Sequence, residues 1–206
     1  MPRPFTEEER ELLRQRLIAA GRELFARFGL RKTTVDELAQ KAGLAKGTFY
    51  LFFPSKEALY AEVLLCELPE MLKRLHERSF GAASDIREAL IRFQEELVGL
   101  IEENELVRAI AADPQNLFSF LSARLDLGEY QRRAEAALAP ILDALREAQR
   151  KGELVPGDPM EILSVLGMIK LLPFYKAQID PELYPRLVKR LSHVIADGLT
   201  CPVKKR

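Results

Sequence analysis

Cysteine and histidine are scarce, and the few that occur lie far apart. The chain of 206 residues contains two cysteines, Cys66 and Cys201, and two histidines, His76 and His193. These residues lack the short spacing that metal sites use. No nucleophile is flanked by a base, and no glycine-rich loop is present to cradle a phosphate. We therefore expect no metal, no cofactor and no enzymatic activity.

A carboxylate enzyme is the competing class. Adjacent glutamates occur at Glu95–Glu96 and at Glu102–Glu103, and an all-helical chain could in principle hold a metal between such pairs. Neither pair has a histidine at ligand spacing, and neighbouring glutamates on a helix are usually a solvated face. The sequence therefore favours a protein that is not an enzyme.

Long hydrophobic runs are also missing. The longest one, Ile162–Tyr175, is too short to cross a bilayer and contains Lys170. Met1–Pro4 leads directly into charged residues, without the apolar stretch of a signal peptide. These features lead us to expect a cytoplasmic protein without a membrane partner.

Strand-like alternation, internal repeats and low-complexity tracts are absent as well. Apolar residues instead recur at helical spacing through most of the chain, which predicts an all-α fold of about nine helices. Ser84 is expected to cap the helix that follows it. The expected helices cover residues 7–28, 35–42, 46–53, 56–78, 85–101, 104–112, 129–151, 160–174 and 181–199.

Net charge is absent too, but the charge is unevenly distributed. The 31 basic and 31 acidic residues cancel, so the total gives no sign of a nucleic-acid partner. Residues 1–56 hold eleven Lys and Arg against seven Asp and Glu, a net charge of +4, which leaves −4 on the remainder. A basic N-terminal part on an acidic body places positive charge where a phosphate backbone would be met.

That basic part contains two short helices joined by a tight turn. Thr34 and Glu37 form a capping box, and Gly43 supplies the left-handed residue that ends the first helix. The second helix is expected over Lys46–Phe53, and Pro54 stops it. Two helices around a short turn with a glycine are typical of a helix-turn-helix.

The same stretch closely resembles the DNA-binding segment of TetR-type transcriptional regulators. The residues that carry the resemblance are Thr34, Leu38, Ala39, Ala42, Gly43, Leu44, Gly47, Phe49, Tyr50, Phe53, Ser55, Lys56, Glu57 and Leu59. The resemblance implies a helix-turn-helix DNA-binding domain over 1–54 and a helical ligand-binding and dimerisation domain over 55–206. It also implies a repressor that binds palindromic operator DNA as a homodimer and is released by a small-molecule effector.

Six residues follow from the resemblance as DNA contacts. They are Thr34, Lys46, Gly47, Thr48, Tyr50 and Lys56. Gly47 would let the backbone approach the duplex, and Thr48 could hydrogen-bond a base edge or touch a thymine methyl. Tyr50 and Lys56 resemble phosphate contacts of the family. Thr34 could alternatively serve only as a cap, and Thr48 could only face solvent.

Apolar stripes near the C-terminus predict the surface that meets a second subunit. The candidate interface residues are Ile162, Leu166, Gly167, Ile169, Leu187, Leu191, Val194 and Ile195. The resemblance favours a four-helix bundle across a two-fold axis. The alternative is that each stripe packs inside its own subunit.

The body of the chain has more large apolar residues than two packed helical layers obviously need. The candidate ligand-binding residues are Phe93, Leu97, Phe118, Phe120, Leu121, Tyr130, Met168 and Phe174. Ligand sites in helical bundles are mostly apolar, so we predict a hydrophobic effector such as a fatty acyl-CoA. The alternative is a regulator of an efflux or stress gene that responds to drugs or other hydrophobic compounds. A helical adaptor without DNA binding would leave the helix-turn-helix pattern unexplained.

Overall fold

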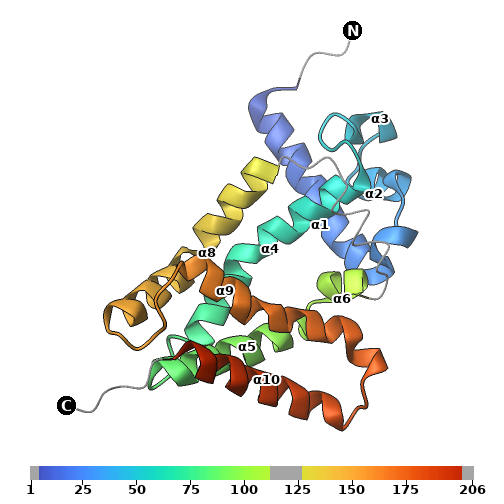
Figure 1. Ribbon diagram of the computed structural model, residues 1–206. Coiled ribbons are helices and arrows are strands. Elements are labelled where there is room, and N and C mark those ends of the chain that lie inside the picture. The colour runs from blue at the N-terminus through green and yellow to red at the C-terminus, as the bar shows by residue number, and fades with distance from the viewer. Residues whose placement is uncertain (1–4, 112–126, 201–206) are drawn as a thin grey trace, which may run out of the picture. The chain divides into compact units, whose positions relative to one another are not determined.

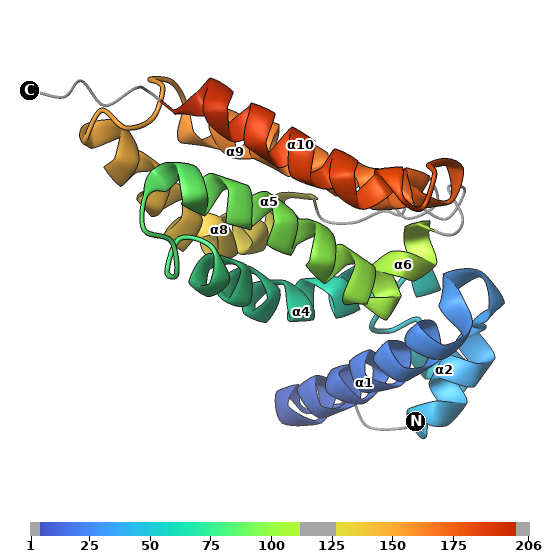
Figure 2. The same cartoon turned by 90° about the horizontal axis from the view of Figure 1, so that it is seen from below.

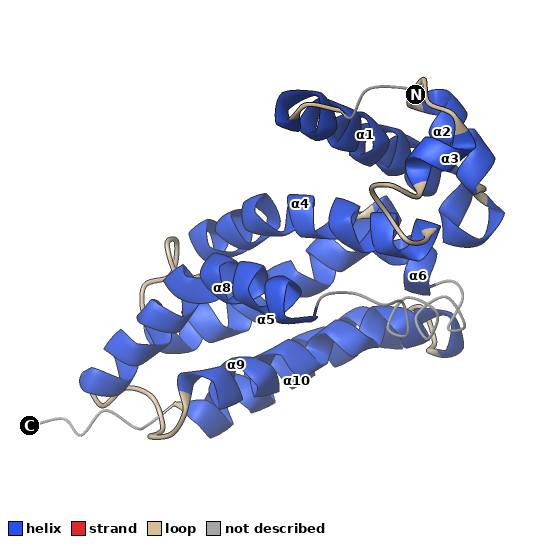
Figure 3. Ribbon diagram, turned by 90° about the horizontal axis from the view of Figure 1, so that it is seen from above, coloured by secondary structure: helices blue, strands red, loops and turns tan. Residues whose placement is uncertain are grey.

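The computed structural model describes residues 5–111 and 127–200, and within them the chain is helical (Figures 1 and 3). In this described part, extended pairing is limited to an isolated bridge between Leu154 and Thr200. The elements are α1 (Glu7–Lys32), α2 (Val35–Lys41), α3 (Lys46–Phe49), α4 (Lys56–Arg78), α5 (Ile86–Glu103), α6 (Glu105–Ala111), α8 (Leu127–Arg150), α9 (Pro159–Gly167), the 3₁₀ helix η1 (Met168–Gln178) and α10 (Leu183–Leu199). The predicted all-α fold is confirmed.

The contacts between residues divide the chain into two compact units. Unit 1 comprises Met1–Glu67 and Glu105–Gln131, and unit 2 comprises Leu68–Asn104 and Arg132–Arg206. Helix α4 therefore contributes residues to both units. The predicted functional boundary after residue 54 stays a prediction, because packing contacts do not define which residues bind DNA.

Unit 1 is built on α1, which begins at the expected residue and extends beyond the expected end at residue 28. The Glu9 N–H donates to the Thr6 hydroxyl (3.2 Å), and the Thr6 N–H donates to the Glu9 carboxylate (2.8 Å). Gly29 has φ +76° and interrupts the helix, which continues for one more turn to Lys32. The Phe25 ring packs edge-on against Tyr60 of α4, with centroids 4.9 Å apart. This buried contact fixes α4 onto the floor formed by α1.

Unit 2 has α5 at its centre, in contact with α9, η1 and α10 (Figure 2). Gln94 of α5 is fully buried and donates from Nε2 to the carbonyl oxygens of Leu90 (3.0 Å) and Ser192 (3.2 Å). The second of these bonds joins α5 to α10. Among the described residues, no helix is long and apolar enough to cross a membrane.

Two details of the expected helices in unit 2 are wrong. The N-cap of α5 is Asp85 rather than Ser84, because the Asp85 carboxylate accepts the Glu88 N–H (2.8 Å). The expected helix over 160–174 is α-helical only to Gly167 and continues as η1. Pro173 lies inside η1, and proline cannot donate to or fit the carbonyl four residues earlier in an α-helix.

Candidate functional site

The first helix of the predicted motif begins at a complete capping box. The Thr34 N–H and hydroxyl both donate to Glu37 Oε2 (2.8 Å each), and the Glu37 N–H donates to Thr34 Oγ1 (3.3 Å). The hydrogen bonds from Thr34 lower the pKa of the Glu37 carboxyl below its ordinary value. Thr34 thus has a capping role, and its side chain remains at the exposed end of α2.

The turn between α2 and α3 depends on a left-handed glycine. Gly43 has φ +72°, a conformation that residues with a Cβ rarely adopt. The Leu44 N–H donates back to the Ala39 carbonyl (2.8 Å), which closes the end of α2. Leu38 and Ala39 are buried. The turn therefore leads the chain from α2, which is anchored by these two buried residues, into α3.

Helix α3 presents one apolar and one polar face. Phe49 is fully buried, and its ring lies 6.1 Å from that of Phe53 between centroids. Lys46, Gly47 and Tyr50 are exposed, and Thr48 is half-buried. The regular helix is shorter than expected, because the amides of Leu51 and Phe52 bond three residues back instead of four. This tighter turn lies directly after the last residue of α3.

Nothing in the described part of the protein requires a glycine at position 47. A Cβ added to Gly47 would meet no atom within 4 Å, and its φ is not positive. The small side chain is therefore not explained by packing within the protein. It leaves the surface open to close approach by another molecule.

Lys46 is held between the two motif helices by an exposed ion pair. Its Nζ lies 2.7 Å from Asp36 Oδ2 on α2. The hydrogen bond to Asp36 raises the pKa of the Lys46 ammonium, so the side chain is charged at neutral pH. Exposed pairs of this kind contribute little to stability. The lysine can therefore exchange Asp36 for a phosphate at small cost.

Lys56, the remaining predicted DNA contact, faces the protein itself. Its Nζ donates to the carbonyl oxygens of Leu30 (2.8 Å), Arg31 (3.1 Å) and Thr33 (2.9 Å). The side chain is half-buried. The phosphate contact predicted for Lys56 stays a prediction, but these three bonds are a feature that the sequence motif did not reveal.

The predicted dimer residues range from buried to exposed in the structure. Ile162, Leu166, Gly167 and Ile169 are buried within the protomer, Leu187, Leu191 and Ile195 are half-buried, and Val194 is 58% exposed. Large apolar side chains that the prediction omitted are exposed on the same elements. They are Val165, Met168, Leu171, Tyr175 and Leu183. Val194 and these five residues make up the uncovered apolar surface of the described part of unit 2.

The predicted ligand-binding residues are only partly described. Phe118, Phe120 and Leu121 lie outside the described residues, as does the side chain of Tyr130 in α8. Phe93 and Leu97 are buried on α5, and Phe93 lies 6.0 Å from the Phe80 ring between centroids. Phe174 is half-buried, whereas Met168 is 52% exposed on η1. The effector site therefore stays a prediction.

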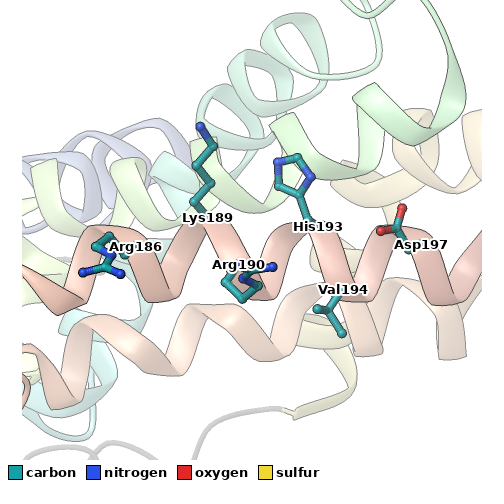
Figure 4. A pocket seen from close by; sticks show the side chains of 6 residues that line it. All are labelled: Arg186, Lys189, Arg190, His193, Val194 and Asp197. Carbon is teal, nitrogen blue, oxygen red and sulfur yellow. The ribbon is translucent and has the colours of Figure 1, made fainter.

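A hollow of about 450 Å³ lies along α10, and among its lining residues Val194 alone belongs to the predicted interface. Its lining residues are Arg186, Lys189, Arg190, His193, Val194 and Asp197 (Figure 4). All six come from one helix, and Figure 4 shows their side chains spread along it rather than converging. Arg87 of α5 bonds to Asp197 (2.6 Å) and contacts His193 Nδ1 (3.3 Å). Five of the six lining side chains carry polar or charged groups, whereas sites for hydrophobic effectors are lined mostly by apolar residues.

Comparisons with known proteins match the helix-turn-helix segment and much of the remaining chain. The family model described as bacterial regulatory proteins, tetR family, matches residues 17–63. The chain is 25% identical over 164 residues to the uncharacterized HTH-type transcriptional regulator YhgD of Bacillus subtilis, covering 75% of this chain and 78% of YhgD. It is 39% identical over 77 residues to YvdT of the same organism, covering 35% of this chain and 40% of YvdT.

The likeness extends to the complete fold. The crystal structure of a TetR-family transcriptional regulator from Pectobacterium atrosepticum superposes with a TM-score of 0.73 at 24% identity, covering 98% of this chain and 100% of that chain. The fold and the exposed face of α3 define a helix-turn-helix transcriptional regulator. Within that class the chain is similar to TetR-family regulators, whose family model matches its residues 17–63.

Proposed function

We propose that the protein is a ligand-responsive repressor that binds a palindromic operator as a homodimer. The observation that carries this proposal is the polar, exposed face of α3, with Phe49 buried beneath it. A helix anchored by a buried aromatic ring and open on its other side suits the major groove of DNA. TetR-family regulators are generally not enzymes, and we propose DNA binding rather than catalysis as the activity.

The residues of α3 and of the turn after it have distinct chemical roles in this proposal. The Thr48 hydroxyl reads a base edge, and the open surface at Gly47 lets the backbone approach the duplex. Lys46 and the Tyr50 hydroxyl contact phosphates, together with the end of α2 at Thr34. Leu51 is 58% exposed and adds an apolar side chain that suits a thymine methyl.

The uncovered apolar surface of unit 2 supports the proposed homodimer. Val165, Met168 and Leu171 are exposed on α9 and η1, and Leu183 and Val194 are exposed on α10. These elements contact one another, and exposed apolar residues on neighbouring elements favour an interaction surface. A second copy of the same surface would cover them across a two-fold axis. Two recognition helices would then reach half-sites about 34–36 Å apart, or a multiple of that distance.

The proposed effector is hydrophobic, with a fatty acyl-CoA as the leading candidate. The predicted site combines the buried Phe93 and Leu97 with other large apolar residues of the body. Unit 1 ends within α4 at Glu67, two residues before Pro69, and this position suits a bend between DNA binding and effector binding. A hundredfold release from DNA needs about 2.7 kcal/mol of differential effector affinity between two states. A drug-responsive regulator of an efflux or stress gene is the alternative.

A gel shift with the DNA upstream of the protein's own gene tests the proposal. We expect a salt-dependent complex that Thr48→Ala alters in base preference and that Tyr50→Phe weakens on all sequences. Acyl-CoAs of increasing chain length are then titrated against the complex, and longer chains are expected to release DNA more effectively. Failure of every length, with release by a cationic drug, would select the alternative effector class.

A further inference from the structure

Lys56 occupies an electrostatically unfavourable position for a lysine. It is the first residue of α4, where the helix dipole presents its positive end. A cation at this position raises the free energy of the helix unless its charged group is stabilised elsewhere. The ammonium of Lys56 reaches back to the end of α1, where a helix dipole is negative. The position is thus explained by a contact between helices.

The three carbonyl oxygens that accept from Lys56 are gathered by the break in α1. Gly29 interrupts the helix at φ +76°, and the single turn that follows ends at Lys32. The last carbonyl groups of a helix have no amide partners within it. Thr33 is 1% exposed, and its N–H (3.3 Å) and hydroxyl (2.8 Å) both donate to the Gly29 carbonyl. The position of these carbonyl groups is therefore also supported by hydrogen bonds that do not involve Lys56.

The hydrogen-bonding capacity of Lys56 is fully used in this arrangement. An ammonium group has three N–H donors, and Nζ makes three bonds of 2.8, 3.1 and 2.9 Å. A phosphate oxygen would have to displace at least one carbonyl. The charge of Lys56 also contributes to the lowered pKa of Glu37, after the hydrogen bonds from Thr34. The ammonium therefore lies where α1 ends, α2 begins and α4 begins.

We propose that Lys56 is a positioning residue that fixes the helix-turn-helix to the start of α4. Thr33, one of its acceptors, directly precedes Thr34, the N-cap of α2. Holding this junction sets the direction of α2, and the short turn at Gly43 transmits that direction to α3. The inference rests on the proposed DNA-binding function, to which Lys56 contributes through α2 and α3 rather than by contacting phosphate.

Two substitutions separate positioning from a phosphate contact. Lys56→Arg keeps the charge, but a planar guanidinium cannot direct three donors at carbonyls grouped around one point. Lys56→Met keeps the approximate length and removes both charge and donors. Lys41→Met is the matched control, because Lys41 also joins α2 to α1, through an exposed pair with Glu23 at 2.6 Å.

The first measurement is amide hydrogen exchange in the protein without DNA, so that it does not depend on finding the operator. We expect both Lys56 variants to exchange the Glu37 and Leu38 amides at the start of α2 about tenfold faster. Amides of α1 before Gly29 should keep wild-type rates, and Lys41→Met should leave all of them unchanged. Wild-type exchange at α2, or equally faster exchange throughout unit 1, would overturn the proposal.

The second measurement is operator affinity at several salt concentrations. Both Lys56 variants should bind about tenfold more weakly, with the slope of log K against log salt unchanged. A phosphate contact would instead leave Lys56→Arg near wild type and reduce the slope for Lys56→Met by about one, and that result would overturn the proposal. If the wild-type protein binds no operator, the proposed function fails, and the exchange data still decide the role of Lys56.

Discussion

The two units of the protein complete their cores in different ways. In unit 1 the most deeply buried side chains include three aromatic rings, Phe25, Phe49 and Tyr60. In the described part of unit 2 the corresponding side chains are aliphatic. They are Leu75, Leu90, Ile141, Leu145 and Leu166. Unit 2 also exposes large apolar side chains on α9, η1 and α10. Unit 1 also exposes large apolar side chains, among them Leu12, Phe28 and Leu51, so the two units differ in the aromatic content of their cores rather than in whether apolar residues are exposed.

The largest expected effect comes from matched phenylalanine truncations in the two units. Phe49→Ala should cost about 3–5 kcal/mol, because it empties a rigid, fully buried site under α3. Phe93→Ala should cost less, about 2 kcal/mol, if the Phe93 ring borders an effector cavity that is already partly empty. Denaturant unfolding followed by hydrogen exchange within each unit measures both. Equal costs would remove the proposed difference in packing.

The next effect tests whether the apolar surface of unit 2 meets a second copy. Val194→Glu places a charge on that surface without disturbing the protomer, because Val194 is 58% exposed. We expect a monomer by sedimentation and about a hundredfold weaker operator binding, or about 2.7 kcal/mol. Lys189→Gln is the control, since it makes the same charge change and Figure 4 shows Lys189 and Val194 pointing to opposite sides of α10. A dimeric Val194→Glu protein would place the interface elsewhere.

A smaller effect is expected from the cap of α2 in unit 1. Thr34→Ala removes a hydroxyl that accepts the Glu37 N–H and donates to its carboxylate. Loss of such a cap costs about 1 kcal/mol, which thermal unfolding can detect. Thr34→Ser keeps the hydroxyl and should retain most of the stability. If serine is as destabilising as alanine, the Thr34 methyl group rather than the cap supports the helix.

The smallest effect concerns acid stability in unit 2. Hydrogen bonds from Ser84 and Arg92 lower the pKa of Glu88 to about 2. A depressed carboxyl pKa stabilises the fold above its ordinary value of 4.5, and this contribution is lost as the pH falls towards 2. As the pH falls from 4.5 towards 2, the melting temperature of Glu88→Gln should therefore decrease less than that of the wild type. Parallel pH profiles for the two proteins would contradict the role of Glu88.

The sequence predicted helix ends best where a side chain terminates the helix. The cap at Thr34 and the left-handed Gly43 are confirmed. The end of regular α-helix at Gly167 was missed, because apolar periodicity continues unchanged into η1 while Pro173 alters the backbone. Periodicity records which residues share a face. It does not determine whether the backbone follows an α or a 3₁₀ path.

For the candidate site, the structure shows which predicted residues are exposed, and their roles in binding stay predictions. Lys46, Gly47 and Tyr50, predicted as DNA contacts, are exposed, and Phe49 between them is buried. The acceptors of Lys56 could not be predicted, because they are backbone carbonyl groups 23 to 26 residues away. Similarly, an apolar pattern cannot distinguish the inner face of α9 from its outer face, since both carry apolar residues.

The central claim, that α3 of each subunit reads one half of a palindromic operator, is tested most directly by footprinting. Hydroxyl-radical cleavage of the DNA upstream of the gene is compared for the wild-type protein and Thr48→Ala. We predict two symmetric protected regions for the wild type, about 34–36 Å apart or a multiple of that distance. Thr48→Ala should alter which sequence is protected without changing that spacing. A single protected region, or uniform protection without sequence preference, would contradict a dimeric repressor that reads DNA through α3.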